Sequence, residues 1–285
     1  MKVKAAAKIN LSLDVTGKLP NSYHTIESVF QTVGLYDEIS VELTEGDIVL
    51  TCEVPEKFAE SDEIPCDERN IAYKTARKFL EENKLNNGCR IHIKKGIPSQ
   101  AGMGGGSTDA AAVIYCLSKL TEKSFSAPEK IGADVPFFLT GGTAYVEGIG
   151  EKITPIADFS GKILVIAKGK EGVSTAEAYN AVDSLVNPSH PDVQGLVNAI
   201  TEGSDTCRYI GNLFESAIKL DEVEDIKKKM TAHGANAACM TGSGSAVFGI
   251  FDTAEKAKIC ADSLTASGYF AEVCETVRDS FIVIE

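Results

Sequence analysis

Apolar and polar residues alternate along the N-terminal part of the chain. Every second residue from Ile9 to Val15 is apolar, a period that predicts a β-strand. Residues 39–43 alternate in the same way and are followed by Glu45-Gly46-Asp47, which predicts a turn and a hairpin. The chain is therefore expected to begin with β-sheet.

The pattern changes to a helical period after Asn70. In residues 71–84 apolar side chains recur every three or four positions, and Asn70 is a suitable N-cap for a helix there. A second helix, rich in alanine, is predicted to end near Leu120, with Ser107 or Thr108 at its cap.

The remaining sequence alternates between strand-like and helix-like segments. Strands are predicted at residues 143–148, 162–169, 237–251 with a Gly-Ser loop inside, 269–276 and 281–285, the last two as an antiparallel closing pair; helices are predicted at residues 191–201, 208–219, 222–233 and 253–267. This order indicates an α+β second half. Because 285 residues exceed an average domain, we expect two domains, residues 1–157 and 158–285.

Composition narrows the classes of protein that fit. The chain has 41 acidic and 28 basic residues and a formal net charge of −13, which argues against broad binding to nucleic acid or to anionic membranes. Neither a secretory signal nor the ~20 apolar residues of a membrane span is expected. Eight cysteines without a CxxC pair are expected to be reduced thiols in the cytoplasm. A monomer or a weak homodimer is expected.

A glycine-rich loop lies between a predicted strand at residues 90–95 and the alanine-rich helix. Four glycines between residues 102 and 106 precede Ser107. Free backbone N–H groups at a helix start bind anions, and glycines let phosphate oxygens approach the backbone closely. The loop lacks the lysine of a Walker A motif and the third glycine of the dinucleotide fingerprint. It is expected to bind phosphate in another way, with tight backbone packing as the alternative.

Four motifs resemble those of the GHMP kinase superfamily, and within it those of kinases that act on a cytidyl sugar alcohol. In chain order they are AAAKINLSLDVTGKLPNSYHTIESVFQTVGLYDEI, IPSQAGMGGGSTDAAA, GADVPFFLTGGTAYVEGIGE and MTGSGSAVFGIF, and they extend from Ala5 to Phe251. The resemblance implies ATP-dependent phosphorylation of a hydroxyl group. It also implies an α+β fold, with an N-terminal α/β domain of the ribosomal-protein S5 domain 2-like type and a C-terminal ferredoxin-like domain.

The resemblance assigns a catalytic pair and a nucleotide loop. Asp134 matches the catalytic aspartate, which takes the proton of the substrate hydroxyl, and Lys8 matches the catalytic lysine. The matching ATP-binding residues are Pro98, Ser99, Gln100, Ala101, Gly102, Met103, Gly104, Gly105, Gly106, Ser107 and Thr108. ATP would carry Mg²⁺ near Ser107, and no metal site built from protein residues alone is expected.

The two catalytic positions are ambiguous when the resemblance is set aside. Lys8, inside an apolar strand, could extend from a sheet edge into solvent. Asp134, between an alanine and Val135-Pro136, could be a turn or capping residue.

Substrate recognition is assigned by the same resemblance. Tyr23 and His24 match the pair that recognises the cytidine part, and Tyr179 lies where a second aromatic ring packs against the base. Packing at a sheet edge is the alternative for Tyr179. Asn10 lies two residues after Lys8 on the same face of the strand, and is expected to bind substrate or orient Lys8.

Some features depart from the family pattern or leave its meaning open. Asn21-Ser22 replaces an Asp-Gly pair, and the short segment between Ser107 and Asp134 leaves little room for a second helix. A second glycine loop, residues 242–244, is expected beside the first. Kinases for homoserine, mevalonate or another small alcohol, and a non-catalytic metabolite sensor on the same fold, stay as alternatives.

Overall fold

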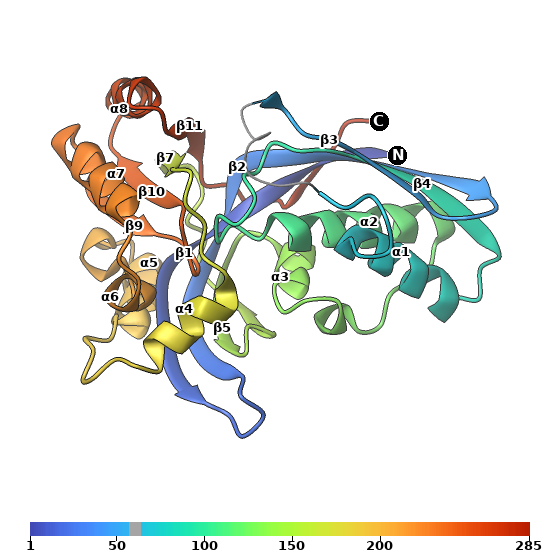
Figure 1. Cartoon of the computed structure of the whole chain (residues 1–285), viewed down its shortest axis with the longest axis horizontal. Coiled ribbons are helices and arrows are strands. Elements are labelled where there is room, and N and C mark those ends of the chain that lie inside the picture. The colour runs from blue at the N-terminus through green and yellow to red at the C-terminus, as the bar shows by residue number, and fades with distance from the viewer. Residues whose placement is uncertain (57–63) are drawn as a thin grey trace.

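Two long antiparallel strands run through most of the molecule. The computed structural model describes residues 1–56 and 64–285, and in it β1 (Lys2–Lys18) pairs with β2 (His24–Glu45). Figure 1 shows this pair extending from the two chain termini to the hairpin at the bottom of the view. The predicted alternating strands are confirmed and are longer than expected.

The first sheet joins β1 and β2 to six further strands in the described part of the chain. These are β3 (Val49–Glu53), β4 (Asn87–Lys94), β5 (Thr143–Gly148), β6 (Lys152–Pro155), β8 (Gly211–Asn212) and β12 (Phe281–Val283). The main order is β12-β1-β2-β4-β3; β5 pairs with β2 and β6, and β8 pairs with β1. One face of the sheet is covered by α1 (Ile71–Glu82), α2 (Gly105–Thr121) and α3 (Val135–Thr140). Asn70 caps α1 as predicted, since its side chain accepts a hydrogen bond from the Ala72 N–H.

The hairpin predicted after residue 43 is wrong. The turn at Gly46-Asp47 exists, but β3 pairs in parallel with β4, which lies between β2 and β3. The turn crosses the start of β4 at Gly88, where an added Cβ would lie 2.3 Å from the carbonyl oxygens of both Gly46 and Asp47. A local turn signal cannot reveal that a later strand inserts at that place.

The second sheet is antiparallel and has the order β11-β7-β10-β9. Its strands are β7 (Ile163–Lys168), β9 (Ala237–Met240), β10 (Val247–Phe251) and β11 (Phe270–Glu275). Helices α7 (Asp221–Ala232) and α8 (Ala254–Ala266) pack against it around a shared apolar core. The described residues also form α4 (Thr175–Val182), α5 (Val193–Glu202) and α6 (Phe214–Ala217), with short 3₁₀ turns at Pro128–Lys130 and Cys207–Tyr209. These elements agree with the expected α+β class.

Two predictions in the second half are wrong. Residues 208–219 do not form one helix, because Gly211-Asn212 pairs with β1 as β8 and leaves only a 3₁₀ turn before it and the short α6 after it. The last two strands are not a pair: β11 joins β7 in the second sheet, whereas β12 joins β1 in the first. Both errors come from pairing with a distant strand, which local periodicity does not encode.

A bulge in β1 distributes one alternating pattern over two cores. The pairing of β1 with β2 shifts register between Asn10 and Ser12. Ile9 therefore lies in the core formed by α5 and one face of the second sheet, whereas Leu13 and Val15 lie in the core on the other face of that sheet, with α7 and α8. A bulge bends a strand and re-aims its side chains, so β1 contributes to both cores.

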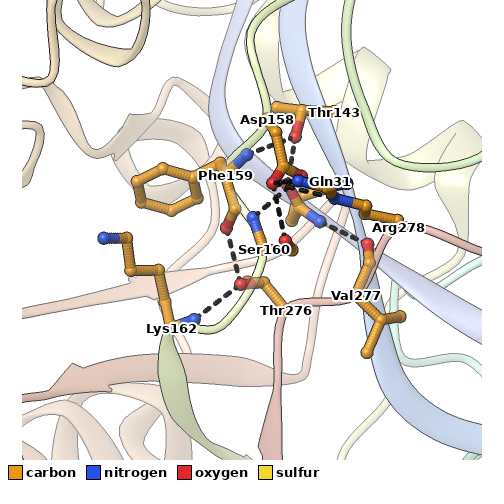
Figure 2. A network of polar contacts seen from close by, with 9 residues as sticks. All are labelled: Gln31, Thr143, Asp158, Phe159, Ser160, Lys162, Thr276, Val277 and Arg278. Carbon is orange, nitrogen blue, oxygen red and sulfur yellow. Dashed lines mark hydrogen bonds and ion pairs between the residues drawn. The ribbon is translucent and has the colours of Figure 1, made fainter.

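A polar network secures the chain where it passes from the first sheet to the second (Figure 2). Gln31 on β2 accepts a hydrogen bond from the Thr143 hydroxyl at 2.7 Å and donates one to the Val277 carbonyl at 2.9 Å. The Thr276 hydroxyl donates to the Phe159 carbonyl at 2.6 Å. The predicted domain division at 157/158 lies beside this network. It stays a prediction, because β8 and β12 come after residue 158 in the sequence and yet pair within the first sheet.

Candidate active site

The glycine loop leads into α2 through left-handed glycines. Gly102 and Gly104 have φ of +70° and +71°, and Gly104 occupies the N-cap position of α2. The prediction of Ser107 or Thr108 as the cap is wrong, because the Gly104 carbonyl already accepts a hydrogen bond from the Thr108 N–H at 2.8 Å. Helix hydrogen bonding thus starts three residues before Ser107. The N–H groups that follow Gly104 lie at the positive end of the helix dipole, a position suited to an anion.

Close packing depends on the glycines of this loop. A Cβ at Gly104 would lie 2.7 Å from the Phe138 ring and 3.4 Å from Cγ of Lys8. At Gly102 a Cβ would lie 2.1 Å from the Thr241 carbonyl oxygen, and at Gly242 it would lie 2.7 Å from the Gly102 carbonyl oxygen. The second glycine loop therefore packs backbone to backbone against the first, as expected.

Lys8 and Asp134 lie together beneath the start of α2. Lys8 Nζ is 3.7 Å from Asp134 Oδ2; the lysine is buried, whereas the aspartate side chain is 28% exposed. Asp134 is the N-cap residue of α3, but its side chain makes no capping hydrogen bond. The carboxylate is thus held at the first turn of a helix while its oxygens stay accessible to a ligand.

The Lys8 ammonium has few partners for a buried cation. Its Nζ donates to Asn10 Oδ1 at 2.8 Å and lies 4.6 Å from the centre of the Phe30 ring. Burial lowers the pKa of Lys8 below its ordinary value, and the nearby Asp134 carboxylate opposes this effect only in part. Asn10 thus contacts Lys8 directly, and its predicted role in binding substrate or orienting Lys8 stays a prediction.

His24 and Tyr179 meet at the hairpin end of the β1–β2 pair. Their rings stack with centroids 4.6 Å apart. The Tyr179 ring also meets the Phe214 ring edge to face, with centroids 5.1 Å apart. Burial, with a smaller contribution from the charge of Asp134, raises the pKa of Tyr179 to about 12. Tyr23 is 60% exposed. The structure thus brings together His24 and Tyr179 and leaves the Tyr23 ring open to solvent.

Asp183 is a further residue of this group that the sequence analysis missed. Its Oδ1 lies 2.7 Å from His24 Nε2, and its Oδ2 pairs with Lys18. Hydrogen bonds from Lys18 and His24 lower the pKa of the Asp183 carboxyl. Asp183 follows Tyr179 by four positions, a spacing that places both on one face of a helix and could have indicated the contact.

A second buried lysine, also missed, lies on the other side of the glycine loop. Lys95 Nζ pairs with Asp37 Oδ2 and, at 3.0 Å, with Asp109 Oδ2. The other oxygen of Asp37 accepts the backbone N–H groups of Gly96 and Ile97 at 2.7 and 2.9 Å. Burial opposes the charge on Lys95, but the two carboxylates outweigh it and raise the pKa of Lys95. This cluster fixes the segment that enters the glycine loop.

Other predicted features can be placed in the described part of the chain. Residues 1–56 and 64–285 contain no group of three or more His, Cys, Asp or Glu side chains able to hold a metal ion. All eight cysteines are free thiols. No described helix has both the length and the apolar character needed to cross a membrane.

Comparison with known proteins connects this geometry to a family of kinases. The family model for the GHMP kinases N terminal domain matches residues 70–142, and that for the GHMP kinases C terminal domain matches residues 189–269. The 4-diphosphocytidyl-2-C-methyl-D-erythritol kinase of Clostridium botulinum is 42% identical over 274 residues, which cover 93% of this chain and 95% of the relative. The chain belongs to the 4-diphosphocytidyl-2-C-methyl-D-erythritol kinase family.

Further relatives agree with membership of this kinase family. The Clostridium acetobutylicum kinase of the same name is 39% identical over 268 residues, covering 90% of this chain and 93% of the relative. A crystal structure of 4-(cytidine 5'-diphospho)-2C-methyl-D-erythritol kinase has a TM-score of 0.80 and 30% identity, covering 96% of this chain and 98% of its own. Homoserine kinase from Cytophaga hutchinsonii, at 18% identity and a TM-score of 0.78 with coverage of 100% and 97%, shares the fold. The resemblance to GHMP kinases is thus confirmed.

Proposed function

We propose that the chain transfers the γ-phosphoryl group of ATP to the 2-hydroxyl of 4-diphosphocytidyl-2-C-methyl-D-erythritol, giving the 2-phosphate and ADP. This reaction belongs to the non-mevalonate route to isoprenoid precursors. The observation that carries the proposal is the position of the Lys8–Asp134 pair: it lies beneath the start of α2. Tyr179 is close enough for the charge of Asp134 to contribute to its raised pKa.

The residues of the pair have complementary tasks. Asp134 accepts the proton of the substrate hydroxyl as the new O–P bond forms, and the bond to the leaving ADP breaks. Lys8 places a positive charge beside that aspartate and beside the transferred phosphoryl group, where negative charge has to be stabilised. Because Lys8 is buried, its charge is weakly screened and acts strongly at this short range.

The glycine loop, Pro98 to Thr108, is proposed to hold the phosphates of ATP. The left-handed Gly104 and the N–H groups at the start of α2 form the proposed cradle, and Gly104 has no room for a side chain because a Cβ there would meet the Phe138 ring. Mg²⁺ bound to these phosphates would neutralise part of their charge. Among the chain's own groups, the Ser107 hydroxyl is proposed to lie closest to it, since no acidic cluster is present in the described residues.

The His24–Tyr179 pair supports a cytidyl substrate over homoserine or mevalonate. Two stacked rings, one of them hydrogen-bonded to Asp183, form an aromatic surface with a polar edge. A nucleobase uses both features, whereas a small aliphatic alcohol uses neither. Tyr23 is proposed to cover the base from the solvent side. We propose that the enzyme acts in the cytoplasm as a monomer or a weak homodimer.

A substrate panel tests the proposed function. Purified protein with Mg-ATP is incubated with the cytidyl substrate, homoserine or mevalonate, and ADP release is measured. We expect turnover with the cytidyl substrate alone, and its loss in an Asp134→Asn variant that still binds ATP. Equal ADP release with and without the cytidyl substrate would refute the assignment, and turnover of homoserine or mevalonate would redirect it. A sensor without catalytic function would bind the ligands without releasing ADP.

A further inference from the structure

A chain of hydrogen bonds leads away from Lys8 into the interior. The Lys8 ammonium donates to Asn10 Oδ1, and Asn10 Nδ2 donates to the Ser28 hydroxyl at 2.9 Å. Ser28 in turn donates to the backbone carbonyl of Ser12 at 2.6 Å. Asn10, Ser12 and Ser28 are each 0% exposed, so water does not compete for these contacts.

The backbone fixes the direction of this chain. A carbonyl oxygen only accepts, so the single hydroxyl proton of Ser28 is committed to the Ser12 carbonyl. Ser28 Oγ can then offer only lone pairs to Asn10, which must present its NH₂ group there. The amide oxygen of Asn10 is consequently the atom that faces Lys8. With the amide reversed, an NH₂ group would face an ammonium, and neither could accept.

Thr241 fixes the same amide from the second glycine loop. Its hydroxyl accepts the Asn10 backbone N–H at 2.9 Å and lies 3.3 Å from Asn10 Oδ1 and 3.5 Å from the Gly102 carbonyl. Thr241 is 0% exposed, and its own carbonyl lies against Gly102. One hydroxyl thus touches the strand of Lys8, the first glycine loop and the amide that holds Lys8.

We propose that the hydroxyl groups of Ser28 and Thr241 are positioning groups for phosphoryl transfer, which together orient the Asn10 amide so that its oxygen holds the Lys8 ammonium. The proposal rests on the proposed role of Lys8 in the reaction. It extends the site to a residue of β2 and to a residue more than two hundred positions later. Docking of the second glycine loop then sets the position of the catalytic cation.

Three substitutions and one matched control separate positioning from packing. Ser28→Ala and Thr241→Val remove one hydroxyl each at nearly constant volume, and Thr241→Ser restores it. Ser12→Ala is the control, because it keeps the backbone carbonyl that accepts from Ser28 and removes only the Ser12 hydroxyl, which is buried on β1 and has no hydrogen-bond partner among the described residues. All four are compared with the unchanged chain in ADP release, with the unfolding free energy measured in parallel.

We expect Ser28→Ala and Thr241→Val each to lower kcat about five- to tenfold, the effect of one hydrogen bond, with KM for ATP within about twofold. Thr241→Ser recovers most of the rate, and Ser12→Ala leaves it unchanged. The double variant should lose less than the product of the single losses, because both hydroxyls act on one amide.

The alkaline side of the pH–rate profile gives a readout that packing alone does not move. Asp134 is the charged side chain paired with Lys8, and Lys8 also contacts the Phe30 ring and the Asn10 amide. Loss of the amide oxygen removes an acceptor for the ammonium and lowers the pKa of Lys8. The alkaline limb should therefore move to lower pH in Ser28→Ala and Thr241→Val only.

A titration of Lys8 without substrate separates this proposal from the proposed function. Lysine labelled with ¹³C is followed by NMR, and the Lys8 signal is assigned by its loss in Lys8→Met. A lower pKa in Ser28→Ala and Thr241→Val, with Ser12→Ala and Thr241→Ser unchanged, supports the orienting role even if the cytidyl substrate proves wrong. Unchanged kcat, pH limb and Lys8 titration in the first two variants, or an equal loss in Ser12→Ala, would overturn it.

Discussion

Two buried lysines lie on either side of the glycine loop, and their surroundings differ. Lys95 pairs with two carboxylates, Asp37 and Asp109, whose side chains are at most 8% exposed. Lys8 has one carboxylate at 3.7 Å, and that carboxylate is 28% exposed. The pKa of Lys95 is raised because two anions outweigh its burial, whereas the pKa of Lys8 is lowered because burial outweighs one.

The contrast separates a structural cation, Lys95, from the cation proposed to be reactive, Lys8. Lys95 donates to two buried carboxylates, one of which, Asp37, also accepts the backbone N–H groups of the segment that enters the loop. Lys8 keeps uncompensated charge beside the Asp134 carboxylate, which a ligand can reach. A buried cation with too few partners is destabilising for the empty protein, and an anionic ligand can supply the missing compensation.

The largest effect is expected for removal of the structural lysine. In Lys95→Met, Asp37 and Asp109 lose their common cation, so we expect the unfolding free energy to fall by ~3–5 kcal/mol. Denaturant unfolding measures the change. Lys94→Met is the matched control, because the Lys94–Glu53 pair is about half exposed, and its loss should be within ~0.5 kcal/mol. Similar unfolding curves for both variants would break the comparison.

Removal of the reactive lysine should affect turnover and spare the fold. In Lys8→Met we expect kcat to fall ~10²- to 10³-fold, comparable to loss of one preorganised charge-stabilising group. The unfolding free energy should stay the same or rise, because a poorly compensated buried charge is gone and the remaining Asp134 is partly solvated. ADP release and denaturant unfolding are measured on the same preparation. A stability loss as large as that of Lys95→Met would make both lysines structural.

The two lysines should also separate on titration with alkali. The pKa of Lys8 is lowered from the ordinary lysine value of 10.5. As pH rises, kcat/KM should therefore begin to decrease before pH 10.5 is reached. The folded-state pKa of Lys95 is raised, so its stabilisation is fully present below the unfolded value and is lost only as pH rises through the raised one. The difference in unfolding free energy between the unchanged chain and Lys95→Met should thus be constant up to about pH 10. A difference that declines together with the rate would contradict the contrast.

The sequence predicted one lysine of this comparison and not the other, for a physical reason. Lys8 and Asp134 lie in motifs, and the alternating pattern around Lys8 marked it as a cation in an apolar strand. Lys95 ends an ordinary alternating strand, and its partners Asp37 and Asp109 come from β2 and α2. The pairing of β2 with β4 brings Asp37 beside Lys95, and the packing of α2 adds Asp109. The predicted cap of the alanine-rich helix was wrong for another reason: a left-handed Gly104 starts α2 before Ser107 and Thr108.

The smallest effect is expected at the far end of the site, where Asp183 holds His24. Asp183 is exposed enough for water to replace part of its interaction, in contrast to Asp37. An ionised carboxylate can only accept, so it keeps the proton on His24 Nε2 and leaves Nδ1 as an acceptor.

In Asp183→Asn this tautomer is no longer enforced. We expect KM for the cytidyl substrate to rise about three- to tenfold, the range of one hydrogen bond, while kcat and KM for ATP change less than twofold. Ser184→Ala is the control, because the Ser184 hydroxyl donates to the Asn180 carbonyl of α4 and not to His24. A fall in kcat at constant KM would instead connect Asp183 to the Lys8–Asp134 pair, and the separation between a recognition end and a reacting end would have to be abandoned.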